Sequence, residues 1–136
     1  MGLRQRDEVV GMKCFRRSAY AALALAAVIG TAIAEDRVQS GRQVFEQRCR
    51  TCHGGTAAAD YPIGPSLSGI IGTKAGTQDS GMHSRAIMDS GIVWNRESLR
   101  RFLSNPQREV PGALMPARVV SAAELDNLLD YLESLR

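Results

Sequence analysis

Five consecutive residues, Cys49-Arg50-Thr51-Cys52-His53, constrain this 136-residue chain more than any other stretch. Two thiols stand three positions apart, and a histidine directly follows the second thiol. This is the spacing of c-type haem attachment, in which each thiol adds to one of the two vinyl groups of the porphyrin. The histidine then lies under the iron and supplies its proximal ligand. The pentapeptide therefore predicts one covalent haem c, attached through Cys49 and Cys52 and ligated by His53.

Three other kinds of site also contain two cysteines at this spacing. A thioredoxin-like redox pair is expected inside a βαβ pattern, and no strand-rich stretch flanks the motif. A zinc site needs further cysteine or histidine ligands, and the chain offers only His83 and Cys14. A plain disulfide remains open for an exported protein. Haem attachment is the interpretation that the additional histidine favours.

The N-terminal third has the features of an export signal. Lys13, Arg16 and Arg17 precede an uncharged, alanine-rich run over 19–33. Ala32-Ile33-Ala34 then fits the small-x-small rule for signal cleavage. We therefore expect this part of the chain, with Cys14, to be removed on export to the periplasm.

The expected domain organisation follows from this cleavage point. We expect a signal peptide over 1–34, with Met12 as an alternative start, and a single small domain over 35–136. The apolar run is shorter than the about 20 residues that span a membrane. Membrane association is accordingly expected only if the segment remains uncleaved.

The charge balance of the expected mature domain excludes a nucleic-acid partner. The full chain has 17 basic and 14 acidic residues; positions 1–34 hold five of the former and two of the latter, which leaves 12 of each sign. A nucleic-acid-binding domain carries a basic patch or stripe, and none remains here. Lys74 is the only lysine after position 34, so a docking face for a redox protein would have to use arginines.

Periodicity and capping patterns predict an all-α fold with long loops. A first helix is expected over 41–49, with Ser40 as N-cap, and a long glycine-rich loop over 56–81 in which Leu67, Ile70 and Ile71 would pack on the haem. Three more helices are expected. The first is a short helix over 84–89. The second is capped by Asn95 and ended by Pro106, and its arginines face water. The last has Ser121 and Glu124 in a capping box, a hydrophobic staple between Val120 and Leu125, and a leucine stripe.

The second axial ligand of the iron has four candidates in the mature chain. Met115 lies in a stiff, proline-bounded loop after the helix that would form the far wall, and it is the favoured ligand. His83 is its main competitor, while Met82 adjoins a loop-to-helix junction. Met88 sits in a helical pattern, where methionine is more often core filler.

Several ordered motifs together resemble the class I cytochrome c family over most of positions 41–135. Besides the haem pentapeptide, they are Gly41 and Phe45, Ile63-Gly64-Pro65-Ser66-Leu67-Ser68-Gly69, Ser90-Gly91-Ile92-Val93-Trp94, Phe102-Leu103-Ser104-Asn105-Pro106, Pro111-Gly112-Ala113-Leu114-Met115 and Tyr131-Leu132. The resemblance implies a small cytochrome c fold, with three to five helices wrapped around one covalent haem.

The resemblance also implies roles for individual residues. Pro65 would offer its carbonyl oxygen to the free nitrogen of His53. Trp94 would donate its indole N–H to a haem propionate, with Lys74 as a second propionate partner because Thr73 replaces an arginine that is common there. Phe102 replaces a tyrosine that contacts the methionine sulfur in many relatives, and His83 replaces another common tyrosine.

The function that these features predict is transfer of single electrons between redox proteins, not enzymatic catalysis. With His53 and Met115 filling both axial positions, no substrate would reach the iron. Two alternatives stay open. One is a gas-binding or sensing haem protein with a displaceable sixth ligand, and the other is a cytochrome subunit of a periplasmic dehydrogenase or oxidase. The chain is expected to be a monomer or a subunit of such a complex, and no distal acid–base pair supports a peroxidase.

Overall fold

The computed structural model describes residues 34–54, 63–78 and 82–135, and Arg37–Arg136 form one compact unit. The described part is helical, as expected, and contains no strand, only an isolated antiparallel bridge between Lys74 and Val93. None of its helices is both long and apolar enough to cross a bilayer. The helical segments are residues 34–48, α2 (Arg50–His53), α3 (Arg85–Asp89), α4 (Arg96–Ser104), α5 (Pro106–Glu109) and α6 (Ala122–Ser134).

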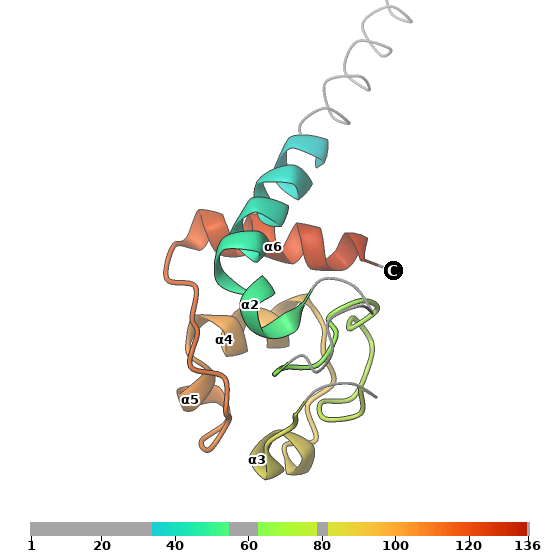
Figure 1. Cartoon of the computed structure of the whole chain (residues 1–136), viewed down its shortest axis with the longest axis vertical. Coiled ribbons are helices and arrows are strands. Elements are labelled where there is room, and N and C mark those ends of the chain that lie inside the picture. Colours follow the sequence, from blue (N-terminus) through green and yellow to red (C-terminus); the bar gives the residue numbers. More distant parts are fainter. Residues whose placement is uncertain (1–33, 55–62, 79–81, 136) are drawn as a thin grey trace, which may run out of the picture. The chain divides into compact units, whose positions relative to one another are not determined.

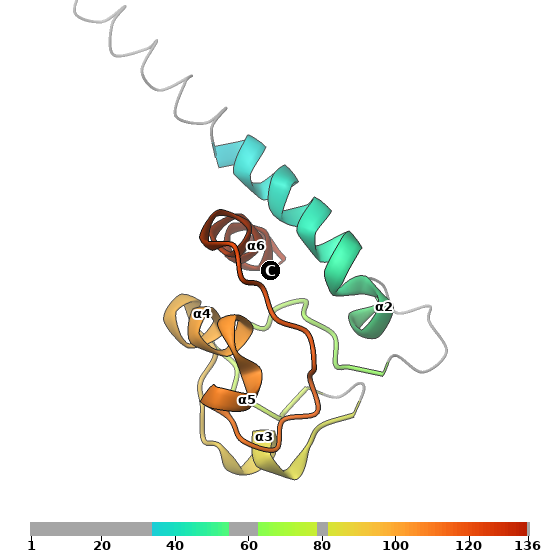
Figure 2. The same cartoon turned by 90° about the vertical axis from the view of Figure 1, so that its left-hand side faces the viewer.

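The first helix, residues 34–48, crosses α6 at close range, as Figures 1 and 2 show from two directions. The crossing is at Gly41, where a Cβ atom would lie 1.9 Å from the carbonyl oxygen of Asn127. One turn further on, the rings of Phe45 and Tyr131 lie with their centroids 5.5 Å apart. Glycine thus permits the backbones to meet, and the aromatic pair fills the space beside them.

The expected start of this helix is wrong. Ser40 does not cap it, because residues 34–40 are already helical. The stretch from Glu35 to Ser40 contains no glycine or proline that would interrupt a helix. Arg37, one turn before Gly41, forms an ion pair with Asp130 of α6 at 3.3 Å. A serine followed by a polar residue at the right spacing was therefore not sufficient evidence for a helix start.

α4 and α5 form the support for the loop that follows them. Asn95 caps α4 as expected, and it also forms a capping box with Ser98. Leu99, Phe102 and Leu103 are buried along one side of α4. Pro106 does end α4, and it also begins α5, a single turn that the sequence did not predict. Proline is favoured at the first position of a helix because its missing N–H would be unpaired there anyway.

α6 supplies the centre of the core. Leu125, Leu128, Leu129 and Leu132 are buried, which confirms the expected leucine stripe. Ser121 accepts a hydrogen bond from the N–H of Glu124 as an N-cap. The expected hydrophobic staple is wrong, because the side chain of Val120 is 78% exposed.

The glycine-rich segment between the first helix and α3 is held by backbone hydrogen bonds in its described part, 63–78. The Gly72 N–H donates to the carbonyl of Trp94 at 2.7 Å, and the Trp94 N–H donates to the carbonyl of Thr73 at 2.9 Å. The Gly69 N–H donates to the carbonyl of Leu135 at 2.7 Å. The expected loop is thus tied to the strand-like residues before α4 and to the end of α6.

Arg96 and Arg100 of α4 face solvent only in part, because they join an ion-pair network with α6. Arg96 contacts Asp130 at 2.7 Å and Glu133 at 2.9 Å, and Arg100 contacts Asp126. The hydrogen bond from Arg100 lowers the pKa of Asp126 below its ordinary value. The sequence placed these arginines on the solvent side but gave no sign of their partners 26 to 37 positions away.

Replacing Asp126 with asparagine is expected to destabilise the protein at neutral pH but not in strong acid. Because the pKa of Asp126 is lower in the folded protein, its ionised form stabilises the fold above about pH 4, the ordinary value, and this contribution disappears as the pH falls through the folded pKa. Thermal unfolding of both proteins at pH 7 and pH 2 measures the difference. Asp89→Asn is the control, because it removes a solvent-exposed ion pair with Arg85. A loss of thermal stability in Asp126→Asn that is equal at both pH values would contradict the expectation.

Candidate functional site

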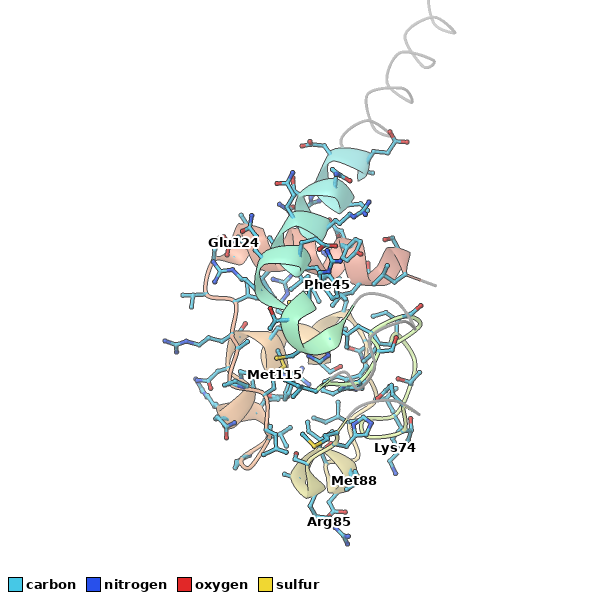
Figure 3. The ribbon with its side chains drawn as sticks, in the orientation of Figure 1. Phe45, Lys74, Arg85, Met88, Met115 and Glu124 are labelled. Atoms are coloured by element: carbon cyan, nitrogen blue, oxygen red, sulfur yellow. The ribbon has the colours of Figure 1, made fainter. Side chains whose placement is uncertain are left out.

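The predicted haem residues, except Ile71 and Lys74, lie around one apolar pocket of about 190 Å³. Cys49, Cys52 and His53 contribute to its lining from the end of the first helix and from α2. Met115 lines the same pocket from the loop between α5 and α6, and it is labelled in Figure 3. The pocket thus brings together the thiols of Cys49 and Cys52, the imidazole of His53 and the thioether of Met115, although Met115 lies more than 60 positions after His53.

The imidazole of His53 is fixed at its edge and on its face. Its Nδ1 atom lies 2.8 Å from the carbonyl oxygen of Pro65, the contact that the family resemblance implies. With Nδ1 protonated and donating to this carbonyl, Nε2 carries the free lone pair. A Cβ atom at Gly64 would lie 2.7 Å from Cε1 of the ring. Glycine at this position therefore lets the backbone lie against the imidazole.

The two cysteines are free thiols in the described structure. Cys49 is buried, and this burial raises the pKa of its thiol to about 11. A thioredoxin-type pair needs the opposite, a thiol whose pKa is lowered so that the thiolate forms near neutral pH. The environment of Cys49 therefore supports attachment to an apolar group over redox exchange of the thiols.

The Met115 loop is anchored on both sides. Before it, the side-chain amide of Gln107 in α5 donates a hydrogen bond to the carbonyl of Ala113. After it, the N–H of Val119 donates to the carbonyl of Leu103 in α4 at 2.8 Å. Val110 and Ala113 are buried between these anchors. The side chain of Met115 is partly buried and packs against the hydrophobic core.

The other candidates for a second axial ligand are placed less favourably. Met88 does not line the pocket, and its side chain lies against Gly76, where a Cβ atom would meet it at 2.8 Å. Met82 lines the pocket but is 64% exposed. His83 also lines the pocket, and its Nε2 atom lies 2.9 Å from the carbonyl oxygen of Gln78.

Of the two expected propionate partners, the structure brings only Trp94 to the pocket. Trp94 is 5% exposed, and its ring packs on Phe102 at a centroid distance of 5.1 Å. No acceptor for its indole N–H is found among the described residues. Lys74 is exposed and does not line the pocket; its backbone forms the bridge with Val93. Of the three residues expected to pack on the haem, Leu67 and Ile70 line the pocket and Ile71 does not.

These residues fit a covalent haem. An imidazole with a free Nε2 and a thioether are the axial donors of cytochrome c-type iron, and the two thiols lie on the same pocket. The apolar lining suits the porphyrin, and Trp94 on the same pocket carries an indole N–H that can donate to an anionic substituent. The chemistry of the donors, and not only their spacing in the sequence, therefore supports the predicted cofactor.

Two residues contribute to the site without having been predicted. Gly64 was seen only as part of a motif, although a Gly-Pro dipeptide near a ligand histidine could have indicated a close backbone approach. Gln107 gave no signal, because a glutamine in a predicted turn is usually solvated. Its contact with Ala113 depends on α5, which the sequence did not predict.

Comparisons with known proteins agree with this site. Residues 38–136 match the family model described as Cytochrome c. Cytochrome c type-1 of Ascaris suum is 40% identical over 102 residues, and the alignment covers 74% of this chain and 90% of that protein. Cytochrome c2 of Blastochloris viridis is 34% identical over 119 residues, and the alignment covers 87% of this chain and 92% of that protein. Among solved structures, cytochrome cH from Methylobacterium extorquens aligns with a TM-score of 0.61 at 28% identity, covering 71% of this chain and 97% of that one.

Proposed function

The chain belongs to the cytochrome c family, and from this premise we propose that it is an exported one-electron carrier whose haem iron is ligated by His53 and Met115. Membership implies one covalently bound haem c, electron transport instead of catalysis, and redox proteins as partners. The proposal adds the identity of the axial ligands, the cellular location and the attachment residues.

One observation carries the proposal: Cys49, Cys52, His53 and Met115 line the same apolar pocket. When bound, the haem supplies an iron that accepts and releases a single electron. Pro65 holds His53 in the tautomer whose Nε2 is free to bind a metal, and Gly64 allows the backbone to support the ring. The anchors at Gln107 and Val119 hold the loop that presents Met115.

The surrounding residues exclude water and hold the cofactor's polar groups. Leu99, Phe102 and Leu103 form an apolar wall, and a low dielectric favours the iron state with the lower net charge. The thioether of Met115 acts in the same direction, toward a higher midpoint potential. Trp94 would bind a haem propionate through its indole N–H.

Export is supported by the basic start, the apolar run and the cleavage pattern that ends at Ala34. The compact unit begins at Arg37, close to that point. N-terminal sequencing of the protein from a periplasmic extract tests this part of the proposal. A start at or near Glu35 is expected, and an intact N-terminal segment in the membrane fraction would argue for an anchor.

The function as a whole is tested by optical spectra of the oxidised and reduced protein, with and without carbon monoxide. We expect low-spin spectra in both states and no binding of carbon monoxide at neutral pH. Acid-acetone should leave the colour on the protein, and mass spectrometry should find the haem adduct on the peptide with Cys49 and Cys52. Rapid carbon monoxide binding would instead favour a gas-binding protein.

Replacing Met115 with alanine is expected to open the sixth position. The ferric protein should lose the weak red charge-transfer band of methionine ligation, and the ferrous protein should bind carbon monoxide. The midpoint potential should fall by roughly 0.2–0.4 V, a part of the range that axial ligands control. Met82→Ala and Met88→Ala are matched controls that should keep the band; its loss in the Met82 variant would show that the ligand is misassigned.

A further inference from the structure

The loop that carries Met115 has few polar contacts. In the described part of the chain, residues 111–118 take part in two hydrogen bonds and in no ion pair. The N–H of Ala113 donates to the carbonyl of Val110 at 3.0 Å, and the carbonyl of Ala113 accepts from the side-chain amide of Gln107. The first bond stays within the same short stretch of chain. Gln107 therefore makes the one hydrogen bond that ties these residues to a helix.

The apolar packing of the same loop is also limited. Ala113 is 4% exposed, and Met115 packs in part against the core. Leu114 lies between them and is 68% exposed, so it adds little. Gly112 passes close to α3, where a Cβ atom would lie 3.3 Å from Cβ of Ala86, but glycine has no side chain to use this contact. When Met115 moves away from the pocket, most of the packing of its loop is lost with it.

The single turn of α5 holds Gln107 in place on the other side of the bond. The side chain of Asn105 accepts a hydrogen bond from the N–H of Arg108 at 3.1 Å and so caps the turn. Glu109 forms an ion pair with Arg101 of α4 at 2.8 Å. Figures 1 and 2 show that the chain leaves α5, passes α4 and continues to α6. The amide of Gln107 thus belongs to a supported element, whereas the carbonyl that it binds belongs to a weakly held loop.

We infer that Gln107 is a positioning residue, a latch whose amide sets how often residues 111–118 swing out and withdraw Met115 from the iron. This inference rests on the proposed function, because it requires Met115 as the axial ligand. The far end of the loop stays fixed, since the N–H of Val119 donates to the carbonyl of Leu103 at 2.8 Å. Opening must therefore break the bond between Gln107 and Ala113, and it would admit a small neutral nitrogen donor to the sixth position.

Binding of free imidazole to the ferric holoprotein measures the latch. At saturating imidazole the observed rate is limited by departure of Met115. Gln107→Met, a side chain of similar length without an N–H donor, should raise this limiting rate roughly three- to tenfold, the effect of losing one hydrogen bond. Gln107→Arg retains an N–H donor and should keep the rate close to that of the unmodified protein. An unchanged rate in Gln107→Met would overturn the inference.

Two control variants test whether the effect is specific. Arg108→Gln changes the next residue of the same turn, whose exposed side chain has no partner in the described part of the chain. Asp126→Asn removes a partner of Arg100 at a position that does not line the pocket. Both should leave the limiting rate nearly unchanged. Equal acceleration in Arg108→Gln, or in Asp126→Asn through lower overall stability, would overturn the role of Gln107 as a latch.

Amide hydrogen exchange, followed by mass spectrometry of the holoprotein, gives a readout that does not depend on ligand binding. Gln107→Met should exchange faster than the unmodified protein in the peptide that covers residues 111–118. Exchange in α6 should remain as it was, because the buried leucines of that helix are untouched. Faster exchange throughout the protein would indicate general loosening and would overturn the inference, as would unchanged exchange in the loop.

The same samples separate this inference from the proposed function. The ferric unmodified protein should show the red charge-transfer band of methionine ligation. If the band is present and Gln107→Met changes neither the imidazole rate nor the exchange of the loop, the ligation by Met115 stands and the latch is overturned. Absence of the band from the unmodified protein would overturn the proposed ligation itself.

Discussion

Replacing both Cys49 and Cys52 with alanine is expected to yield a chain without haem and without a cooperative thermal unfolding transition. Much of the buried core also lines the pocket: Cys49, Ile70, Trp94, Leu99, Phe102, Leu103, Leu128 and Leu132. Without a cofactor these side chains would surround a cavity of about 190 Å³. At about 24 cal/mol per Å³, such a cavity costs ~4–5 kcal/mol. Small domains have only about 5–15 kcal/mol of net stability.

Circular dichroism during heating measures this prediction, with near-ultraviolet spectra as a second probe of fixed packing. The single variants Cys49→Ala and Cys52→Ala are the controls, because each retains one thioether link and the His53 ligand. They should still melt cooperatively, at lower temperature. A cooperative, native-like transition in the haem-free double variant would contradict the prediction.

Replacing Gly41 with alanine is expected to destabilise the holoprotein strongly. Alanine is a better helix former than glycine by about 1 kcal/mol, so an exposed position would gain stability. Here the new Cβ would lie 1.9 Å from the carbonyl oxygen of Asn127 and 2.8 Å from Cβ of Tyr131. These are backbone and near-backbone atoms, so relief requires the two helices to move apart. Overpacking of this kind costs about 1–3 kcal/mol or more.

The clash should exceed the helix gain and lower the melting temperature by roughly 10 °C, at ~4–8 °C per kcal/mol for a domain of this size. Gln43→Ala is the matched control: it lies in the same helix, is exposed and should change stability little. An equal or higher melting temperature for Gly41→Ala would mean that the crossing can widen without loss. The optical spectrum should remain that of the unmodified protein, because Gly41 does not line the pocket.

Local patterns predicted those parts of the fold that depend on near neighbours. The leucine stripe of α6, the cap at Asn95 and the buried side of α4 follow from periodicity and capping within a few residues. The staple at Val120 failed because a hydrophobic residue before a cap must also find a packing partner, and here it faces solvent. The Ser40 cap failed because the preceding residues are equally able to form helix.

The site could be predicted from the sequence where its chemical groups belong to short motifs. The haem pentapeptide and the proline-bounded Met115 are local signals, and the structure places them on one pocket. The supports of the site join separate segments: Gly64 lies against the ring of His53, and the N–H of Val119 donates to the carbonyl of Leu103. Lys74, expected near a propionate, lies outside the pocket because its segment pairs with Val93 through the backbone.

The double restraint on His53 has a consequence for how quickly charge can move. Its ring is held at one edge by the Pro65 carbonyl and pressed on one face by Gly64, so it has little freedom to turn. On the proposed ligation, the imidazole of His53 would keep its position when the bound haem changes its oxidation state. A small change of bond geometry between oxidation states means a small reorganisation energy. The rigid support of His53 by Pro65 and Gly64 therefore favours fast electron transfer to and from the protein.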